Sequence, residues 1–472
     1  MTEGDLPMKH RYPSEQLEVE VTGLSEKGLG LAEYRFPDTE LGKGRKLKLQ
    51  IPKALPGDKL LVTVPNARGR RRATRTYDRI IEPSPSRNGG YELNGPQVGG
   101  APLEYMNYPD QLAYKRELTQ TFLADQGFDP SVVGEVWGMD DPYHYRNKLE
   151  LSFSIDGDLG FFAQGDQYQI VDWQKNILAP EIFMILKEEV QAWQKAWNLA
   201  GYEKQSKQGL LRQLLLRQGQ QSGEVMVAIF AQEESADLDP GVIEDLIQRL
   251  QAYPEIKSLM WIKNTAIADR MGADQVEVLA GRDYIRDELA GFNYRLYFDT
   301  FFQPNPTQAQ KMIDLACDWA ELDQDSLVID LFCGVGSFSL PLAKRAKALV
   351  GIEIVEQSIE SAKRNARDNR ITNAHFIARD ARHGLAEIEE EWGQADLLLL
   401  DPPRNGAGGK IMRRIGRMGL DKIIYVSCNP KSLAADLVWL REFGYEIAKI
   451  QLIDQFPHTQ HVECVVLIEK KS

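Results

Sequence analysis

The feature that most constrains the fold is a regular alternation of short apolar runs and helical patterns after about residue 295. The apolar runs have the length of buried strands, and helical segments such as 337–345 and 356–369 separate them. This alternation is typical of a parallel sheet with helices on both faces. We therefore predict an α/β fold with a doubly wound, Rossmann-like parallel sheet. Its expected strands include 326–331, 348–352, 396–400, 422–426, 446–451 and 462–469.

The chain ahead of this sheet contains two further regions. At roughly 150 residues per domain, a chain of this length has about three domains. Residues 17–80 show short alternating strands and turns, and 83–102 are rich in Pro, Gly, Ser and Asn, as linkers are. Between the predicted linker and the doubly wound sheet, at about 105–290, helical and strand patterns alternate without a fixed order. We predict an OB-like β-barrel over 10–85, an α+β domain over 100–292 and the doubly wound domain over 293–472.

The predicted barrel carries a local excess of positive charge. The whole chain has a net charge of −13, which by itself argues against a nucleic-acid partner. Between residues 41 and 79, however, twelve basic residues face two acids, Asp58 and Asp78, so this segment carries +10 and the remainder −23. A basic module on an acidic body indicates local binding of a polyanion, although a solvated charged loop is the simpler alternative. The basic residues are Lys43, Arg45, Lys46, Lys48, Lys53, Lys59, Arg68, Arg70, Arg71, Arg72, Arg75 and Arg79.

Composition excludes several classes of protein. Hydrophobic residues make up 43% of the chain, but no run approaches the roughly 18 apolar residues that a membrane helix needs. The N-terminal residues lack the anatomy of a signal peptide, so we expect a cytoplasmic protein, and we expect it to be a monomer. Four cysteines are too few for a disulfide framework, and at least one can therefore be chemical. They are Cys317, Cys333, Cys428 and Cys464.

The ends of the first two predicted strands indicate a nucleoside-containing cofactor. The first strand runs into the glycine-rich segment 330–337, where a ligand can approach the backbone at a helix N-terminus. Glu353 ends the second strand, nineteen residues after Gly334, at about the distance expected of an acid that binds ribose hydroxyls. Phe338 and Ser339 stand where a dinucleotide fingerprint has its third glycine. This favours S-adenosylmethionine over NAD, although an NAD-dependent oxidoreductase remains an alternative.

Three groups with chemical potential follow the later strands. Asp401-Pro402-Pro403-Arg404 comes directly after the fourth strand, and its prolines fix an extended backbone that can form a wall beside a planar base. Cys428 follows the fifth strand, and Glu463 begins the apolar run of the last. A rigid loop exit and a buried structural cysteine are the simpler alternatives. Because ligands of such sheets bind beyond the strand ends, we place all three groups in one crevice.

Methylation of a pyrimidine ring carbon needs these groups together. Carbon 5 of uracil is a poor nucleophile, so a thiolate first adds to carbon 6 and creates an enolate that attacks the methyl group. A base then removes the proton from carbon 5, and the thiolate leaves. Cys428 and Glu463 are the two groups that this scheme requires, and Asp401 with Arg404 could polarise the ring edge.

At these positions the sequence resembles the RNA uracil-5 methyltransferase family. The resemblance lies in the order and spacing of the motifs over about 170 residues, and it extends weakly to Tyr145-Arg146-Asn147-Lys148. Gly28-Leu29-Gly30, the Pro-Gly-Asp turn and the basic strand pair resemble a TRAM domain, an OB-like barrel that binds RNA. The matching motifs are Phe301-Phe302-Gln303-Pro304-Asn305, 330–337, Asp401 to Arg404, Ser427-Cys428-Asn429-Pro430 and His461-Val462-Glu463.

The resemblance implies a function and a set of residue roles. It implies S-adenosylmethionine-dependent methylation of carbon 5 of one uridine in RNA through a covalent cysteine-uracil intermediate. A separate basic barrel favours 23S ribosomal RNA as the substrate, with transfer RNA as the alternative. By resemblance, Cys428 is the nucleophile and Glu463 the base, and the cofactor site is lined by Gln303, Phe332, Glu353, Asp380 and Asp401.

One departure from the family pattern concerns iron. Many relatives bind an iron-sulfur cluster through cysteines in a Cys-Gly-Gly-Cys context, but the matching stretch here reads Val98-Gly99-Gly100-Ala101. No cysteine occurs before Cys317. A cluster held by cysteine thiolates is therefore not expected, and neither is another metal.

Two other classes remain open at this point. An amino-directed base methyltransferase typically has an aromatic residue after Asp/Asn-Pro-Pro, where this sequence has Arg404. A non-catalytic RNA-binding assembly factor would not need Cys428, so Cys428→Ala would be silent in a methylation assay.

Overall fold

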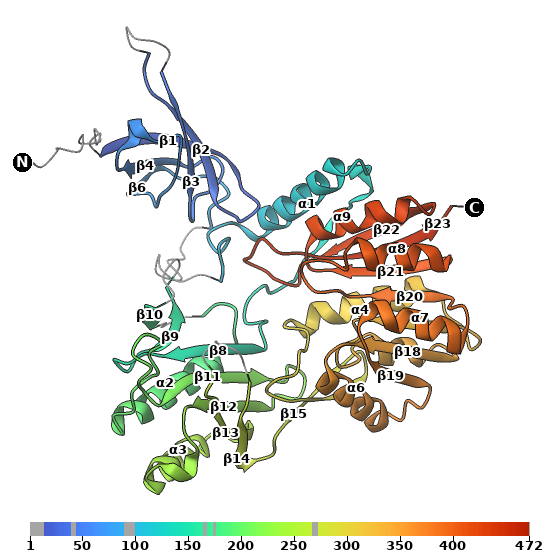
Figure 1. Ribbon diagram of the computed structural model, residues 1–472. Helices are drawn as coiled ribbons and strands as arrows, with labels where there is room; N and C mark the ends of the chain where they lie inside the picture. The colour runs from blue at the N-terminus through green and yellow to red at the C-terminus, as the bar shows by residue number, and fades with distance from the viewer. Residues whose placement is uncertain are drawn as a thin grey trace, which may run out of the picture. The chain divides into compact units, whose positions relative to one another are not determined.

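The computed structural model describes residues 14–38, 44–88, 100–163, 168–172, 176–266 and 272–471 (Figure 1). These residues form two compact units. The first contains the described residues up to 88 together with 100–118 and 456–460, and the second contains the rest. Helix α1 (Tyr108–Asp125) begins in the first unit and ends in the second. Residues 1–13, Lys43 and most of the predicted linker, including Val98-Gly99, lie outside the described residues.

The first unit contains a six-stranded sheet. Its buried side chains alternate along the strands, as the sequence pattern predicts: Leu17, Val19 and Val21 point to one face, and Leu47, Leu49 and Ile51 do the same. The β3–β5 pair is parallel and the others are antiparallel. The strands, in spatial order, are β5 (Arg72–Thr74), β3 (Lys46–Ile51), β2 (Gly30–Arg35), β1 (Glu15–Leu24), β4 (Lys59–Val64) and β6 (Arg79–Glu82).

A buried carboxylate holds the Pro-Gly-Asp turn of this sheet. Asp58 is fully buried and accepts hydrogen bonds from the backbone amides of Leu55 and Ser84, at 2.6 and 2.8 Å. Arg87 binds the same carboxylate through two nitrogens, both at 2.7 Å. Residues 84–88 are thus attached to the sheet, although the sequence composition places them in a linker.

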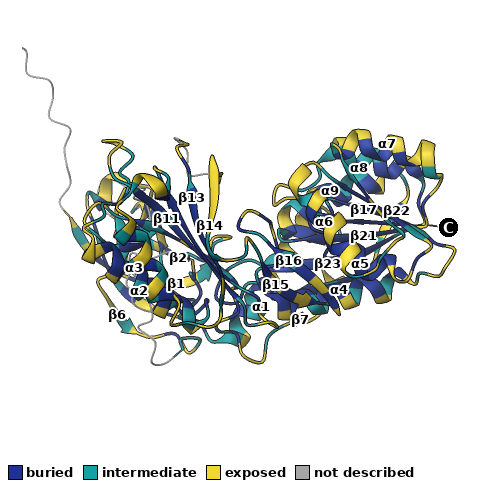
Figure 2. Ribbon diagram, turned by 90° about the horizontal axis from the view of Figure 1, so that it is seen from below, coloured by how far each residue is buried: buried dark blue, intermediate teal, exposed yellow. Residues whose placement is uncertain are grey.

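The second unit contains a seven-stranded mixed sheet. Helices α2 (Glu181–Ala196) and α3 (Pro240–Leu250) pack on one face, where Trp193 meets Trp261 edge-on. The β12–β13 pair is parallel and the others are antiparallel. Figure 2 shows edge strand β14 as exposed. The order is β10 (Ile170–Asp172), β9 (Leu159–Phe162), β8 (Lys148–Phe153), β11 (Leu211–Gln218), β12 (Val225–Ala231), β13 (Ile256–Lys263) and β14 (Gln275–Gly281).

A hairpin follows this sheet and precedes the doubly wound region. It consists of β15 (Ile285–Leu289) and β16 (Phe292–Leu296), paired antiparallel. Its buried residues share one hydrophobic core with the second face of the seven-stranded sheet and with α4 (Pro306–Ala320). The hairpin therefore joins the two halves of the second unit.

The doubly wound region is an eight-stranded sheet, which confirms the predicted α/β class. The five strands from β19 to β21 are parallel. The order is β19 (Ala374–Ala378), β18 (Ala348–Glu353), β17 (Leu327–Leu331), β20 (Leu397–Leu400), β21 (Lys422–Ser427), β23 (Glu463–Lys470), β22 (Tyr445–Ile453) and β7 (Val136–Trp137). The helices are α5 (Ser339–Ala343), α6 (Glu356–Asp368), α7 (Ala381–Trp392), α8 (Gly409–Met418) and α9 (Pro430–Arg441).

Two details of the sheet differ from the sequence prediction. The sheet is not parallel throughout, because β23 runs antiparallel to both β21 and β22. A parallel connection needs a crossover of a dozen or more residues, and the segment 454–462 between β22 and β23 is shorter than that. In addition, the helix expected over 337–345 is the five-residue α5.

Within the described part of the chain, no helix combines the length and the apolar character needed to cross a membrane.

Candidate active site

Four polar segments meet at the carboxyl edge of the parallel strands. β17 leads into the glycine turn, β18 ends at Glu353, β20 leads into Asp401 and β21 leads into Cys428. These strands are direct neighbours in the sheet and run in the same direction, so their ends lie side by side. The structure thus brings together the strand-end residues that the sequence singled out.

The antiparallel last strand places Glu463 opposite Cys428. Ser427 of β21 pairs with Cys464 of β23, and one further step in this antiparallel register sets Cys428 against Glu463. Residues opposite one another project from the same face of a sheet. Reversal of β23 relative to β21 is therefore what brings a carboxylate to the thiol.

Glu463 is buried with part of its carboxyl group unsatisfied. The residue is 6% exposed, and its Oε2 has no hydrogen-bond partner among the described residues. Burial raises the pKa of Glu463 well above its usual range, and the negative charge of Asp401 adds to the shift. A buried polar atom without a partner costs free energy, so such an atom in a native fold is a candidate for contact with a ligand.

The Cys428 thiol is half-buried beside these carboxylates. Burial, together with the charges of Glu463 and Asp401, raises the pKa of Cys428 to about 12, and the charge of Arg404 opposes this shift. The sulfur is therefore a protonated thiol at neutral pH in the ligand-free protein. Burial also raises the pKa of Asp401.

The loop after β20 is bonded to the loop after β21. The Arg404 carbonyl accepts hydrogen bonds from Asn429 Nδ2 at 2.9 Å and from Ser432 Oγ at 3.1 Å. The exposed Arg404 side chain places Nη2 2.9 Å from Nδ1 and 3.0 Å from Nε2 of His461. Asn429 also caps α9 through the Lys431 amide. Sequence reasoning did not identify Asn429, Ser432 and His461 as supports, although the Asn-Pro pair after Cys428 is a helix-start signal.

The glycine turn after β17 is open to a ligand. Gly334 has φ +53° and Gly336 has φ +89°, and a Cβ added to Gly334 would meet no atom within 4 Å. Phe332 is also left-handed, with φ +68°, which is strained for a large side chain. Beneath the turn, the buried Asp330 accepts a hydrogen bond from Ser339, and burial raises the pKa of Asp330 to about 7.

Glu353 at the end of β18 is oriented by its own backbone. Its Oε1 accepts hydrogen bonds from the amides of Ile354 and Val355, at 2.8 and 3.0 Å. Both of these residues expose apolar side chains, Ile354 to 66%. An open glycine turn, an oriented carboxylate and adjacent apolar surface suit the sugar and base of a nucleoside. The carboxylate of Asp401 suits the positively charged amino-acid end of S-adenosylmethionine. The residues present therefore fit S-adenosylmethionine.

Asp380 acts as a helix cap in this structure. It caps α7 through the Arg382 amide at 3.0 Å, and the Arg382 guanidinium binds both of its carboxylate oxygens, at 2.8 and 3.0 Å. The hydrogen bond to Arg382 lowers the pKa of Asp380 to about 2. Asp380 lies two residues beyond the end of β19, and its role toward a cofactor stays a prediction.

Gln303 enters from the segment before α4. The residue is buried, and its Oε1 accepts a hydrogen bond from Gln455 Nε2 at 3.2 Å. Gln455 lies two residues beyond Ile453, which pairs with Glu463, so Gln303 is connected to the sheet edge that carries Glu463. Its carbonyl accepts a hydrogen bond from Asn147 Nδ2 at 2.9 Å, and the Asn147 amide donates to the Pro304 carbonyl. This explains the presence of Asn147 in the weaker motif 145–148.

Comparisons with known proteins identify the family of this chain. The family described as tRNA (Uracil-5-)-methyltransferase matches residues 107–471. An uncharacterized RNA methyltransferase from Clostridium tetani is 31% identical over 476 residues, covering 98% of both chains. Another, from Halalkalibacterium halodurans, is 33% identical over 462 residues and covers 97% of each.

A solved structure is similar over nearly the whole chain. It is the Pyrococcus abyssi tRNA (uracil-54, C5)-methyltransferase in complex with S-adenosyl-L-homocysteine, with a TM-score of 0.74 and 25% identity. The similarity covers 96% of this chain and 100% of that one. The chain therefore belongs to the tRNA (uracil-5-)-methyltransferase family, and it is an S-adenosylmethionine-dependent RNA methyltransferase of the uracil-5 type.

Proposed function

We propose that this protein methylates carbon 5 of one uridine in RNA with Cys428 as the nucleophile and Glu463 as the base. The observation that carries the proposal is the position of a half-buried thiol opposite a buried carboxylate whose Oε2 lacks a partner among the described residues. An NAD-dependent oxidoreductase or an RNA-binding factor would give these two groups no joint task. Arg404 in place of an aromatic residue argues against an amino-directed enzyme.

The chemistry starts at the sulfur. Cys428 loses its proton to water and Sγ bonds to carbon 6, so that the electron pair of the C5–C6 double bond moves to carbon 5 and on to the carbonyl at carbon 4. Because the pKa of Cys428 is raised in the ligand-free protein, substrate binding must lower it. Arg404 already acts in that direction, and it can also stabilise the enolate oxygen.

Glu463 completes the cycle. S-adenosylmethionine supplies an electrophilic methyl group, which carbon 5 accepts while keeping its hydrogen. The Glu463 carboxylate then takes that proton, the C5–C6 double bond reforms, and the bond from carbon 6 to Sγ breaks. A carboxylate whose pKa is raised by burial is a stronger base than an ordinary one, which suits this step.

The cofactor is held by the residues around the glycine turn. We assign the binding of the ribose hydroxyls to Glu353. The cofactor approaches the backbone at the turn that begins at Phe332, and Asp401 and Gln303 bind its amino-acid end. Asp380, which follows the edge strand β19, is a further candidate, although its carboxylate is already bonded to Arg382.

We further propose that the substrate is 23S ribosomal RNA, bound partly through the first unit. The support is the exposed basic surface of that unit, which includes Arg68, Arg70, Arg71, Arg72 and Arg79. Transfer RNA is the second candidate, because the Pyrococcus abyssi tRNA enzyme matches 96% of this chain.

Methyl transfer from labelled S-adenosylmethionine tests the chemistry. Wild-type protein should label carbon 5 of uridine in RNA, and Cys428→Ala should lower the rate by at least about a thousandfold. Cys317→Ala is the matched control, because Cys317 is buried in α4, away from the strand ends. Robust methylation by Cys428→Ala would contradict the assignment.

Mapping of 5-methyluridine in a deletion strain tests the substrate. Loss of the modification from ribosomal RNA supports the first candidate, and loss from transfer RNA replaces it with the second. The triple variant Arg70→Gln/Arg71→Gln/Arg72→Gln should bind the substrate RNA more weakly and with a smaller salt dependence. An unchanged salt dependence would contradict a role of this surface in binding RNA.

A further inference from the structure

We propose that Asn365 is a positioning residue for S-adenosylmethionine, which holds the glycine turn after β17 in the conformation that receives the cofactor. The inference rests on the cofactor site proposed above, and it concerns a residue that bonds to the glycine turn but is not itself assigned to that site. Asn365 lies on α6 and is fully buried.

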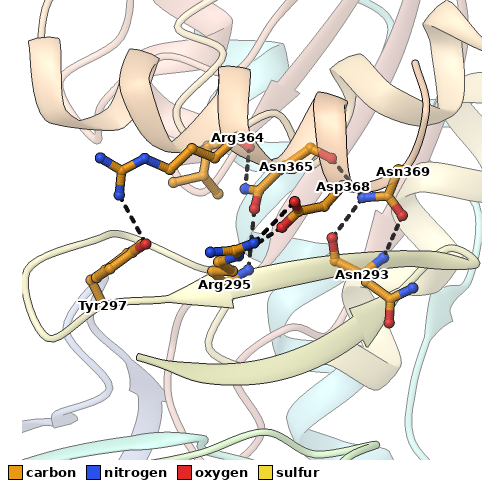
Figure 3. A network of polar contacts seen from close by, with 8 residues as sticks. Asn293, Arg295, Tyr297, Arg364, Asn365, Asp368 and Asn369 are labelled. Carbon is orange, nitrogen blue, oxygen red and sulfur yellow. Dashed lines mark hydrogen bonds and ion pairs between the residues drawn. The ribbon is translucent and has the colours of Figure 1, made fainter. Parts of the chain in front are cut away.

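Both ends of the Asn365 side-chain amide are used (Figure 3). Its Nδ2 donates to the Val335 carbonyl, in the glycine turn, at 3.1 Å. Its Oδ1 accepts from the backbone amide of Arg295, on β16, also at 3.1 Å. Asparagine is a poor helix former, and a buried amide is costly unless it is bonded. Its place in the buried face of α6 therefore calls for a specific role, and these two bonds provide one.

The Val335 carbonyl controls the shape of the turn. Asn365 holds this carbonyl, and the other end of the same peptide unit, the Gly336 amide, donates to the Cys333 carbonyl at 2.9 Å. Glycine residues at 334 and 336 give the segment wide conformational freedom. The two bonds remove that freedom before the ligand binds, so less entropy is lost on binding.

The same helix also carries the second cofactor segment. α6 starts at Glu356, directly after Glu353 and its two exposed apolar neighbours. Through Asn365, the helix that follows β18 is bonded to the turn that follows β17. Asn365 therefore fixes the spacing between the two segments that a nucleoside would contact together.

Neighbouring contacts at the C-terminal end of α6 provide an internal control. Asn369 bonds with β16 much as Asn365 does: its Oδ1 accepts from the Asn293 amide at 2.8 Å, and its Nδ2 donates to the Asn293 carbonyl at 2.6 Å (Figure 3). The Arg295 guanidinium donates to both carboxylate oxygens of Asp368, at 2.7 and 3.0 Å. Among these three side chains, only that of Asn365 bonds to the turn within the described part of the chain. Loss of Asn369 thus weakens the helix–strand contact and leaves the turn bonded.

Calorimetric titration with S-adenosylhomocysteine, without RNA, separates the two roles. Asn365→Asp keeps the acceptor for Arg295 but loses the donor to Val335, and we expect about tenfold weaker binding, equal to about 1.4 kcal/mol. Asn369→Asp loses a comparable donor, and its dissociation constant should stay within about twofold of wild type, while both variants lower the thermal midpoint. Asn365→Ala, which buries no charge, should also bind S-adenosylhomocysteine more weakly than wild type. It replaces Asn365→Asp in the comparison if that variant does not fold.

Two outcomes would overturn the proposal. One is wild-type affinity for S-adenosylhomocysteine in a folded Asn365 variant. The other is an equal loss of affinity in Asn369→Asp, which would make the effect one of general stability. In turnover, the Asn365 variants should raise the KM for S-adenosylmethionine and leave RNA affinity unchanged. Because the titration needs neither RNA nor Cys428, its result is independent of the proposed uridine chemistry.

Discussion

Two buried carboxylates in the second unit differ in how completely they are bonded. Asp287, on the hairpin strand β15, is 1% exposed and accepts hydrogen bonds from the backbone amides of Gln220, Gln221 and Ser222. Glu463, on β23, is 6% exposed, and its Oε2 has no partner in the described part of the chain. Burial raises the pKa of both, but the three amides oppose the shift at Asp287. The difference separates a carboxylate that holds a turn from one that is available for a substrate.

A similar contrast holds between the seven-stranded sheet and the doubly wound sheet. In the seven-stranded sheet, buried charged groups bond to backbone, as Arg217 does to the carbonyls of Tyr297 and Thr300 at 2.6 and 2.9 Å. At the edge of the doubly wound sheet, in addition to burial, the charge of Asp401 raises the pKa of Glu463, and the charges of Glu463 and Asp401 raise the pKa of Cys428. On the proposed mechanism, buried charge serves stability in the seven-stranded sheet and chemistry at the edge of the doubly wound sheet.

The largest expected effect comes from the matched acid-to-amide changes. Glu463→Gln should lower kcat by about a thousandfold or more and leave the thermal midpoint unchanged or higher, because an unsatisfied acid is removed. Asp287→Asn should retain kcat and lose about 1–3 kcal/mol of stability, because an amide nitrogen would face backbone donors. Steady-state methylation and thermal denaturation measure both. A loss of stability in Glu463→Gln as large as that in Asp287→Asn would contradict the distinction between a structural carboxylate at Asp287 and a catalytic one at Glu463.

Arg217 should behave like Asp287. Arg217→Met removes one hydrogen bond from the Tyr297 carbonyl and one from the Thr300 carbonyl, in the segment that leads to Gln303. We therefore expect a thermal midpoint lower by about 4 °C or more. Methylation measured well below that midpoint should fall far less than in Glu463→Gln. Arg217→Lys, which keeps the charge, should lie between Arg217→Met and wild type. A thousandfold loss of kcat in folded Arg217→Met would place this residue with the catalytic group instead.

A smaller effect concerns the reactivity of Cys428. Below its pKa of about 12, the thiolate fraction rises about tenfold per pH unit, so the alkylation rate by iodoacetamide should still climb between pH 8 and pH 10, where an unperturbed thiol levels off. Arg404→Gln removes a charge that lowers the pKa and should slow alkylation at pH 9. Glu463→Gln removes a charge that raises the pKa of Cys428 and should therefore speed alkylation at pH 9. Peptide mass spectrometry of Cys428 gives the rates, and a plateau above pH 8.5 would contradict the raised pKa.

Sequence reasoning found the strands and strand ends of the doubly wound region because each is a local pattern. It placed Asp401 and Cys428 correctly at strand ends, since a short apolar run followed by a proline motif marks the end of a strand. It did not find that β23 is antiparallel, and so it could not derive why Glu463 faces Cys428. That relation depends on the register between two strands separated by more than thirty residues.

Other features depend on contacts that leave no local signal. β7 is two residues long and joins the sheet edge beside β22, far from it in sequence. The amide of Asn365 bonds to both Val335 and β16, yet in the sequence it is a polar residue in a charged helix. Such roles follow from packing between distant segments, which composition and periodicity do not encode.

The fate of RNA bound to Glu463→Gln tests the central claim most directly. With labelled S-adenosylmethionine and substrate RNA, this variant can still form the sulfur bond and accept the methyl group, but it lacks the base that resolves the intermediate. We predict a protein–RNA adduct that survives denaturing electrophoresis, carries the labelled methyl group and maps by mass spectrometry to Cys428. Efficient turnover without an adduct, or an adduct on Cys333 or Cys464, would contradict the division of labour between Cys428 and Glu463.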